Sequence, residues 1–200
     1  MRISTLAALA TMLLLPVAAN GQRVREGLGV SVSVSHLNFA GGAMTPATGT
    51  EIRPANGLTF EIGADWNRRG WMASIGTGFA REPVQASDAI SALVDRTLPI
   101  NRYRLVGALT RWLVSNRRSR FGLAAAPLLD HWTGNGLRAR TVLGFEAQVR
   151  LAFPVGRVEL ENRASLGWEG SPFSTTDLGS NASPRTLRTV SLGLALRYRP

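Results

Sequence analysis

Residues 190–198 read Val-Ser-Leu-Gly-Leu-Ala-Leu-Arg-Tyr, a strict alternation of large apolar residues with small or polar ones. Successive side chains of a β-strand point to opposite faces, so this stretch predicts a strand with one apolar and one polar face. The same alternation recurs upstream, and the other strands are expected at 26–37, 57–66, 71–81, 100–114, 120–129, 139–153 and 157–169. The sequence therefore predicts an all-β protein of eight strands.

The joins between these segments alternate strictly in length. Short joins fall at 67–70, 115–119 and 154–156, and long ones at about 40–56, 82–98, 130–138 and 170–185. Barrels of the bacterial outer membrane have this asymmetry, with short periplasmic turns and longer extracellular loops. We therefore expect an eight-stranded antiparallel up-and-down transmembrane β-barrel. In the loop at 82–98, Ser87 or Asp88 is a candidate cap for a short helix through Arg96.

The N-terminus has the pattern of a secretory signal. Met1-Arg2 is a short basic start, residues 3–15 are apolar, and small residues follow at 17–19. We expect residues 1–21 to be a cleaved signal peptide and residues 22–200 to form the barrel domain. An uncleaved anchor helix is the alternative, although the apolar stretch is short for a spanning helix.

The composition excludes several classes of protein. The formal charge of +10 arises from 23 basic residues, all of them Arg, against 13 acidic ones, and Cys is absent. Lipidation on Cys, disulfides and Cys-ligated metals are therefore excluded. The Arg residues are dispersed and several lie at short turns, which suits snorkelling to a membrane interface better than nucleic-acid binding. No phosphate-binding loop or metal-ligand cluster is present, so no cofactor is expected.

Aromatic residues fall near the ends of the expected strands. Two girdles of aromatic side chains at the membrane interfaces are typical of such barrels. On the short-turn side we expect Trp66, Trp71, Phe121, Phe153 and Tyr198, and on the long-loop side Phe60, Phe79, Tyr103 and Trp168.

With these strands, the whole mature chain resembles the small eight-stranded outer-membrane barrels, such as the transmembrane domain of outer-membrane protein A and its relatives. The final strand, 190–198, carries this resemblance most clearly. Such barrels end on an amphipathic strand closed by an aromatic residue that the barrel-assembly machinery reads, whereas here Arg199 and Pro200 follow Tyr198. The resemblance implies outer-membrane lipid and lipopolysaccharide as surroundings and a monomeric state, but no particular activity.

Charged residues on the polar faces predict an ion-pair network inside the barrel. Buried charges must be paired and hydrogen-bonded, because their desolvation is costly. Strands six and seven are hairpin partners, so Arg150 is expected beside Glu159 or Glu161. A static plug is favoured over a gated pathway because eight strands enclose little space. The expected network contains Glu61, Asp65, Arg102, Arg104, Glu146, Arg150, Glu159, Glu161 and Arg163.

His131, Thr133 and Glu146 are weak candidates for a catalytic site. A hydroxyl, an imidazole and a carboxylate near the outer surface look like the triad of lipid A deacylases, which are also eight-stranded barrels. That family uses Ser, however, and Glu146 lies deeper along its strand than His131.

Three functions stay open from the sequence. The leading one is a non-enzymatic outer-membrane barrel with a structural or surface-interaction role. The second is a hydrolase that modifies lipid A at the outer leaflet. The third is a secreted lipocalin-like barrel, with the apolar face inside and a small hydrophobic ligand bound there.

Overall fold

The computed structural model describes residues 26–88, 92–134, 137–178 and 182–200, so the expected signal peptide at 1–21 lies outside the described residues. Within those ranges no helix is long and apolar enough to cross a membrane. The elements are β1 (Gly27–Thr45), β2 (Thr50–Pro54), β3 (Gly57–Arg68), β4 (Trp71–Ser87), β5 (Ala92–Ser115), β6 (Arg120–Gly134), β7 (Leu137–Val155), β8 (Val158–Glu169), α2 (Thr175–Leu178) and β9 (Ser183–Tyr198).

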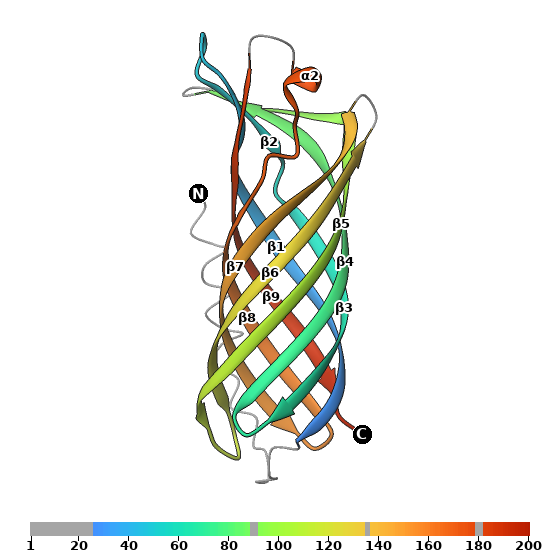
Figure 1. The fold of residues 1–200 in the computed structure, drawn as a ribbon, viewed down its shortest axis with the longest axis vertical. Coiled ribbons are helices and arrows are strands. Elements are labelled where there is room, and N and C mark those ends of the chain that lie inside the picture. Colours follow the sequence, from blue (N-terminus) through green and yellow to red (C-terminus); the bar gives the residue numbers. More distant parts are fainter. Residues whose placement is uncertain (1–25, 89–91, 135–136, 179–181) are drawn as a thin grey trace.

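The strands close into an eight-stranded antiparallel barrel (Figure 1). Sequential strands pair from β3 to β9, and β1 pairs with both β3 and β9, which closes the cylinder. The β1–β9 register runs from Val30↔Tyr198 to Met44↔Ser183, with one bulge between Gly41 and Ala43. The short strand β2 pairs with β1 and β4 at the end where α2 also lies. The predicted up-and-down barrel is confirmed.

Short turns join the strands at the end of the barrel opposite α2 (Figure 1). Arg68 pairs with Trp71, so the turn between β3 and β4 consists of Arg69 and Gly70, both with positive φ, 48° and 79°. Two positive φ values suit the twist of a hairpin, and Gly adopts such a conformation without steric cost. The predicted alternation of short turns and longer connections is confirmed.

Several strands are longer than the sequence pattern suggested. Residues 84–87 of β4 pair with residues 92–95 of β5, so the hairpin continues beyond the barrel wall. The prediction of a helix from Ser87 or Asp88 through Arg96 is therefore wrong for the residues that the structure describes, because cross-strand pairing keeps this segment extended. Residues 89–91 lie outside the described residues. Likewise, most of the loop expected at 40–56 belongs to the β1–β2 hairpin.

Pro127 lies in the middle of β6, where a missing backbone N–H interrupts the ladder. The β5–β6 pairing lapses after Val106↔Leu128 and resumes in the same register at Leu109↔Ala125. On its other side Pro127 remains opposite Phe145 of β7. The barrel thus accommodates the proline by losing contacts on one edge without a change of register.

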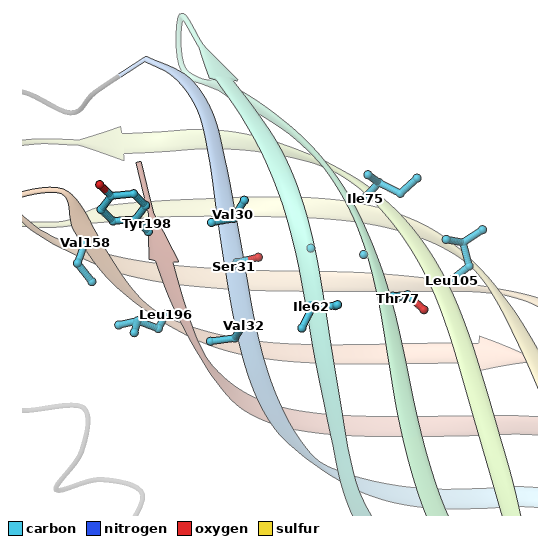
Figure 2. A pocket seen from close by; sticks show the side chains of 12 residues that line it. Val30, Ser31, Val32, Ile62, Ile75, Thr77, Leu105, Val158, Leu196 and Tyr198 are labelled. Atoms are coloured by element: carbon cyan, nitrogen blue, oxygen red, sulfur yellow. The ribbon is translucent and has the colours of Figure 1, made fainter. Parts of the chain in front are cut away.

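The large apolar residues of the strands face outward. Leu28, Phe60 and Ile62 are 71%, 60% and 61% exposed, whereas the inward-facing Arg102 and Arg150 are 0% and 1% exposed. Figure 2 shows part of the outer face, where Val30, Ile62, Ile75 and Leu105 border a shallow hollow of about 600 Å³. The lipocalin-like alternative is wrong, because it requires the apolar face to line the interior.

Candidate functional site

Alternation along each strand delivers a set of charged side chains to the interior. In β7, for example, Glu146, Gln148 and Arg150 occupy every second position, and all three are buried. We call the connected set of interior side chains the lumen network. It consists of Glu61, Asp65, Arg102, Arg104, Arg120, Asp130, Glu146, Gln148, Arg150, Glu159, Glu161, Arg163, Glu169, Arg197 and Arg199.

At the α2 end of the barrel, two arginines of β5 share the carboxylate of Asp130. Arg102 donates from Nε and Nη2 to Oδ2 of Asp130, at 2.9 and 2.6 Å, and from Nη2 to Glu169 at 3.0 Å. Arg104 donates to both carboxylate oxygens of Asp130 at 3.0 Å and also to Glu146. Asp130 is therefore paired bidentately, the strongest geometry for a guanidinium and a carboxylate.

The middle of the network continues through a neutral side chain. Gln148 donates from Nε2 to Glu146 at 3.0 Å and accepts at Oε1 from Nε and Nη2 of Arg150, at 3.0 and 2.6 Å. Arg150 Nη1 lies 3.7 Å from Glu161. Arg163 bridges Glu161, at 3.2 Å, and Glu61, at 3.3 Å. The amide of Gln148 thus links the two charged ends.

At the short-turn end, Arg197 is surrounded by carboxylates. It donates to Asp65 at 2.6 Å, to Glu161 at 3.0 Å and to Glu159. Arg199, beyond the last strand, also donates to Asp65 at 3.0 Å. Arg120 donates to Glu159 at 3.0 Å and to Asn67 at 2.8 Å. Through the ion pair of Arg150 and Glu161, the lumen network therefore extends from Glu169 to Arg120, which also binds Asn67.

Apolar side chains lie over the network at both ends. At the α2 end, a buried cluster contains Leu37, Phe39, Ile100, Trp132, Val142 and Leu187. The Arg102 guanidinium lies 5.6 Å from the ring centre of Phe39 and 5.1 Å from that of Trp132. At the opposite end, Met72, Trp112 and Ala152 are buried together, and the Arg120 guanidinium lies 3.9 Å from the Trp112 ring centre.

These contacts determine whether the buried charges of the interior stabilise or destabilise the folded barrel. Removing a charge from water is costly, and mutual attraction offsets that cost only where the pairs are well formed and hydrogen-bonded. Most guanidinium groups of the network meet this condition. The carboxylate of Glu82, in β4, is a buried group without such pairing. Glu82 is 1% exposed, and neither of its carboxylate oxygens has a hydrogen-bond partner in the described part of the chain.

All nine charged residues expected in the lumen lie within the lumen network. Arg150 lies beside Glu161, as one of the two expected pairings has it, whereas Glu159 binds Arg120 and Arg197 instead. The sequence analysis missed Arg120, Asp130, Glu169, Arg197 and Arg199. Alternation continued to the strand ends would have found them, because each lies two residues from an inward-facing position.

The expected girdle residues lie on the outer face. Trp66, Trp71, Phe121 and Tyr198 are exposed at the short-turn side and Phe153 is half-buried; Phe60, Phe79, Tyr103 and Trp168 are exposed nearer the α2 end. The rings of Phe79 and Tyr103 are 5.3 Å apart. Near the short turns, guanidinium groups stack on two of the tryptophans: Arg68 on Trp66 at 5.9 Å and Arg111 on Trp71 at 5.0 Å.

The three weak catalytic candidates are not brought together. His131 is exposed on the outer face, and its Nδ1 is 2.8 Å from Oγ1 of Thr141. Glu146 is 4% exposed inside the barrel and is bound by Arg104. A base and its orienting carboxylate must share a hydrogen bond, and here the barrel wall separates them. Within the described ranges, no three His, Asp or Glu side chains form a candidate metal site.

Residues 171–177, between β8 and β9, are attached by hydrogen bonds to the α2 end of the barrel. Ser171 donates to the carbonyl of Gly42, and Arg140 donates to the carbonyl of Phe173, a residue that is 1% exposed. Asp177 accepts from the backbone N–H groups of Arg138, at 3.0 Å, and Ser174, at 2.8 Å. Partial burial raises the pKa of Asp177, but the bonds from Ser174 and Arg138 outweigh it and hold the pKa below its usual value.

Two solved structures are similar to this one over most of both chains. Neisserial surface protein A, from Neisseria, has a TM-score of 0.58 and 14% identity, covering 87% of this chain and 97% of that one. The outer membrane protein OprG from Pseudomonas aeruginosa has a TM-score of 0.53 and 8% identity, covering 90% and 100%. The chain has the fold of a small outer-membrane β-barrel. Its sequence matches no protein-family model and no curated protein.

Proposed function

We propose that the protein is a closed, non-enzymatic barrel of the outer membrane with a structural or surface-interaction role. The lumen network carries this proposal. Its hydrogen bonds, together with the ion pair of Arg150 and Glu161 at 3.7 Å, connect Glu169 at one end to Asn67 at the other, and apolar clusters lie over both ends. An eight-stranded barrel is only wide enough for side chains to fill, so the network acts as a plug.

The outer face supports the proposed location. Outward-facing apolar side chains suit a lipid environment, and closure of the barrel leaves no open sheet edge in the membrane. The aromatic residues at both ends of this face suit the two interfaces of the bilayer. Outer-membrane lipid and lipopolysaccharide would then surround a monomer, with the β9 strand presented to the barrel-assembly machinery and no contact with nucleic acid.

The surface-interaction role rests on the elements at the α2 end of the barrel, which are β2, the segment from Ser171 to Asp177 and the outer part of the β4–β5 hairpin. β2 pairs with two strands, and the segment from Ser171 to Asp177 is hydrogen-bonded to β1 and β7. On the β4–β5 hairpin, Leu93 is 72% exposed and Val94 is 41% exposed, far along the strand from the Tyr103 girdle. Exposed apolar residues on a fixed scaffold are typical of surfaces that bind a partner.

Conductance across a planar bilayer tests the closed lumen. The refolded protein should give no discrete current steps, while a porin inserted in the same bilayer provides the positive control. Discrete steps from the wild-type protein would refute the plug. Membrane extraction tests the location separately: the protein should migrate compactly on a gel until it is boiled, whereas recovery as a soluble periplasmic species contradicts the membrane assignment.

A further inference from the structure

A row of three outward-facing side chains crosses β3, β4 and β5 near the short turns. Arg68 pairs with Trp71 across β3 and β4, and Trp71 pairs with Arg111 across β4 and β5. All three residues are exposed on the outer face. Directly opposite residues of neighbouring strands have their Cβ atoms about 5 Å apart, so one tryptophan stands between two guanidinium groups on the same face.

Both guanidinium groups lie against indole rings. Arg111 is 5.0 Å from the ring centre of Trp71, and Arg68 is 5.9 Å from that of Trp66, two residues earlier in β3. An aromatic face attracts a guanidinium group without occupying its N–H donors. The contacts with the rings therefore fix the positions of the two cations and leave their donors available for an anion.

Neither Arg68 nor Arg111 forms an ion pair with a carboxylate in the described part of the chain, in contrast to the arginines of the lumen network. Glu26 is the acidic side chain that contacts this turn, and its carboxylate accepts from the backbone N–H of Arg69 at 2.9 Å. The other exposed charged side chains described at this end are all arginines, namely Arg69, Arg117, Arg118 and Arg157. The rim at the short turns is therefore electropositive.

An apolar hollow lies farther along the same strands, on the same outer face (Figure 2). Of the residues that border it, Ile75 is four residues from Trp71 in β4, and Leu105 is six residues from Arg111 in β5. These separations correspond to about 13 and 20 Å at 3.3 Å per residue. Gly107, opposite Ile75, has no side chain, and nothing lies within 4 Å of the place that a Cβ would occupy. The outer wall is therefore recessed at the depth where lipid hydrocarbon lies.

We propose that this face binds an anionic phospholipid of the periplasmic leaflet, with its phosphate between Arg68 and Arg111. The guanidinium groups donate charge-assisted hydrogen bonds to the phosphate oxygens, Trp71 packs against the glycerol region, and an acyl chain lies in the hollow. A zwitterionic lipid binds less well, because its headgroup carries a positive charge into the electropositive rim. The inference rests on the outer-membrane location proposed above, in which the short turns face the periplasm.

The indole N–H signals of the tryptophans in NMR spectra test the site in the folded protein. The protein is placed in uncharged maltoside micelles at 0.1 M salt and titrated with short-chain phosphatidylglycerol. The signals of Trp66 and Trp71 should shift and saturate. Those of Trp168, at the opposite girdle, and of the buried Trp112 and Trp132 should stay in place. Short-chain phosphatidylcholine should give no saturable shift.

Two double variants separate the site from general attraction to a basic surface. Arg68→Gln with Arg111→Gln should weaken the apparent affinity for phosphatidylglycerol about tenfold. Arg117→Gln with Arg118→Gln removes the same charge from the exposed turn after β5. This control should stay within about threefold of the wild type, because 0.1 M salt screens exposed charges beyond about 10 Å. Neither double variant alters a buried side chain.

Three outcomes would overturn the site. They are the absence of a saturable shift of Trp66 and Trp71 in the wild-type protein, an equal loss of affinity in both double variants, and an equal saturable shift with inorganic phosphate alone. The last would show that the anion binds without a lipid. Failure of the membrane location is distinguishable, because it is read from membrane extraction and heat-dependent gel mobility. A heat-modifiable membrane barrel that does not prefer phosphatidylglycerol lacks only this site.

Discussion

Arg197 of β9 donates to Asp65 of β3 with Nε 2.6 Å from Oδ2, although β1 lies between these two strands. Both side chains are 1% exposed. The pair therefore crosses the interior behind β1, the strand whose pairing with β9 completes the cylinder. It fastens the closing strand from inside, in addition to the backbone hydrogen bonds.

Asp65→Asn should destabilise the barrel by about 3–5 kcal/mol, because it removes a buried carboxylate that accepts hydrogen bonds from both Arg197 and Arg199. Urea titration followed by the heat-sensitive gel mobility measures this loss. Arg118→Gln, in the exposed turn before β6, should stay within about 0.5 kcal/mol of the wild type. A similar small change for Asp65→Asn would show that the pair contributes nothing to closure.

Glu82→Gln should leave stability unchanged or raise it. The carboxyl group of Glu82 is buried without a hydrogen-bond partner among the described residues, so a neutral amide of similar size loses no interaction there. Glu161→Gln is the matched control and should be strongly destabilising, since Glu161 accepts from Arg163 and Arg197. The same urea titration compares the two variants; an equal loss for both contradicts the distinction between them.

Gly144→Ala should cost about 1–3 kcal/mol, because a Cβ at this position would lie 2.7 Å from Glu169 Cβ and 2.8 Å from the Trp168 carbonyl. Gly107→Ala should be neutral or slightly stabilising, since a Cβ there meets nothing within 4 Å. Both glycines lie within strands of the barrel, which makes their unfolding midpoints directly comparable. A destabilised Gly107→Ala would contradict this account of the packing.

The attachment of α2 should weaken in acid. The pKa of Asp177 is lowered in the folded protein, so its contribution is fully present above the unfolded value and is lost as pH falls through the folded pKa. The Arg138 amide, which donates to Asp177, should titrate in NMR spectra with a midpoint below 3.8, the ordinary value. Asp177→Asn should abolish that titration. A midpoint above 3.8 in the wild-type protein would contradict the attachment of α2 to β7 through Asp177.

His131→Ala should leave the acylation of lipid A in cells unchanged. His131 contacts Thr141 on the outer face, and Glu146 is held by Arg104 inside the barrel, so no relay connects them. Mass spectrometry of lipid A from cells with either form of the protein measures this. If the lipid A of cells with the wild-type protein lacks an acyl chain that is retained in cells with the His131→Ala variant, the hydrolase is supported instead.

Alternation predicted which residues of each strand share a face, and the alternation of long and short connections then favoured the polar face as the inner one. It did not predict which strands lie opposite one another across the lumen, and for that reason the partners of Arg197 were not foreseen. Their identity depends on the stagger of the strands around the barrel, which is a property of the closed sheet. Glu82 was missed for a different reason: it was expected in a loop, where alternation assigns no face.

The pairing of β1 with β9 also governs how the protein folds. It joins the first strand of the barrel to the last, so the contact with the greatest separation in sequence must form before any edge is protected. Until then, an open sheet in lipid would expose unpaired backbone groups, and the buried ion pair of Arg197 and Asp65 could not form. Partly closed intermediates are therefore disfavoured on both counts. We expect slow closure in a single cooperative step, with insertion and completion of the wall occurring together.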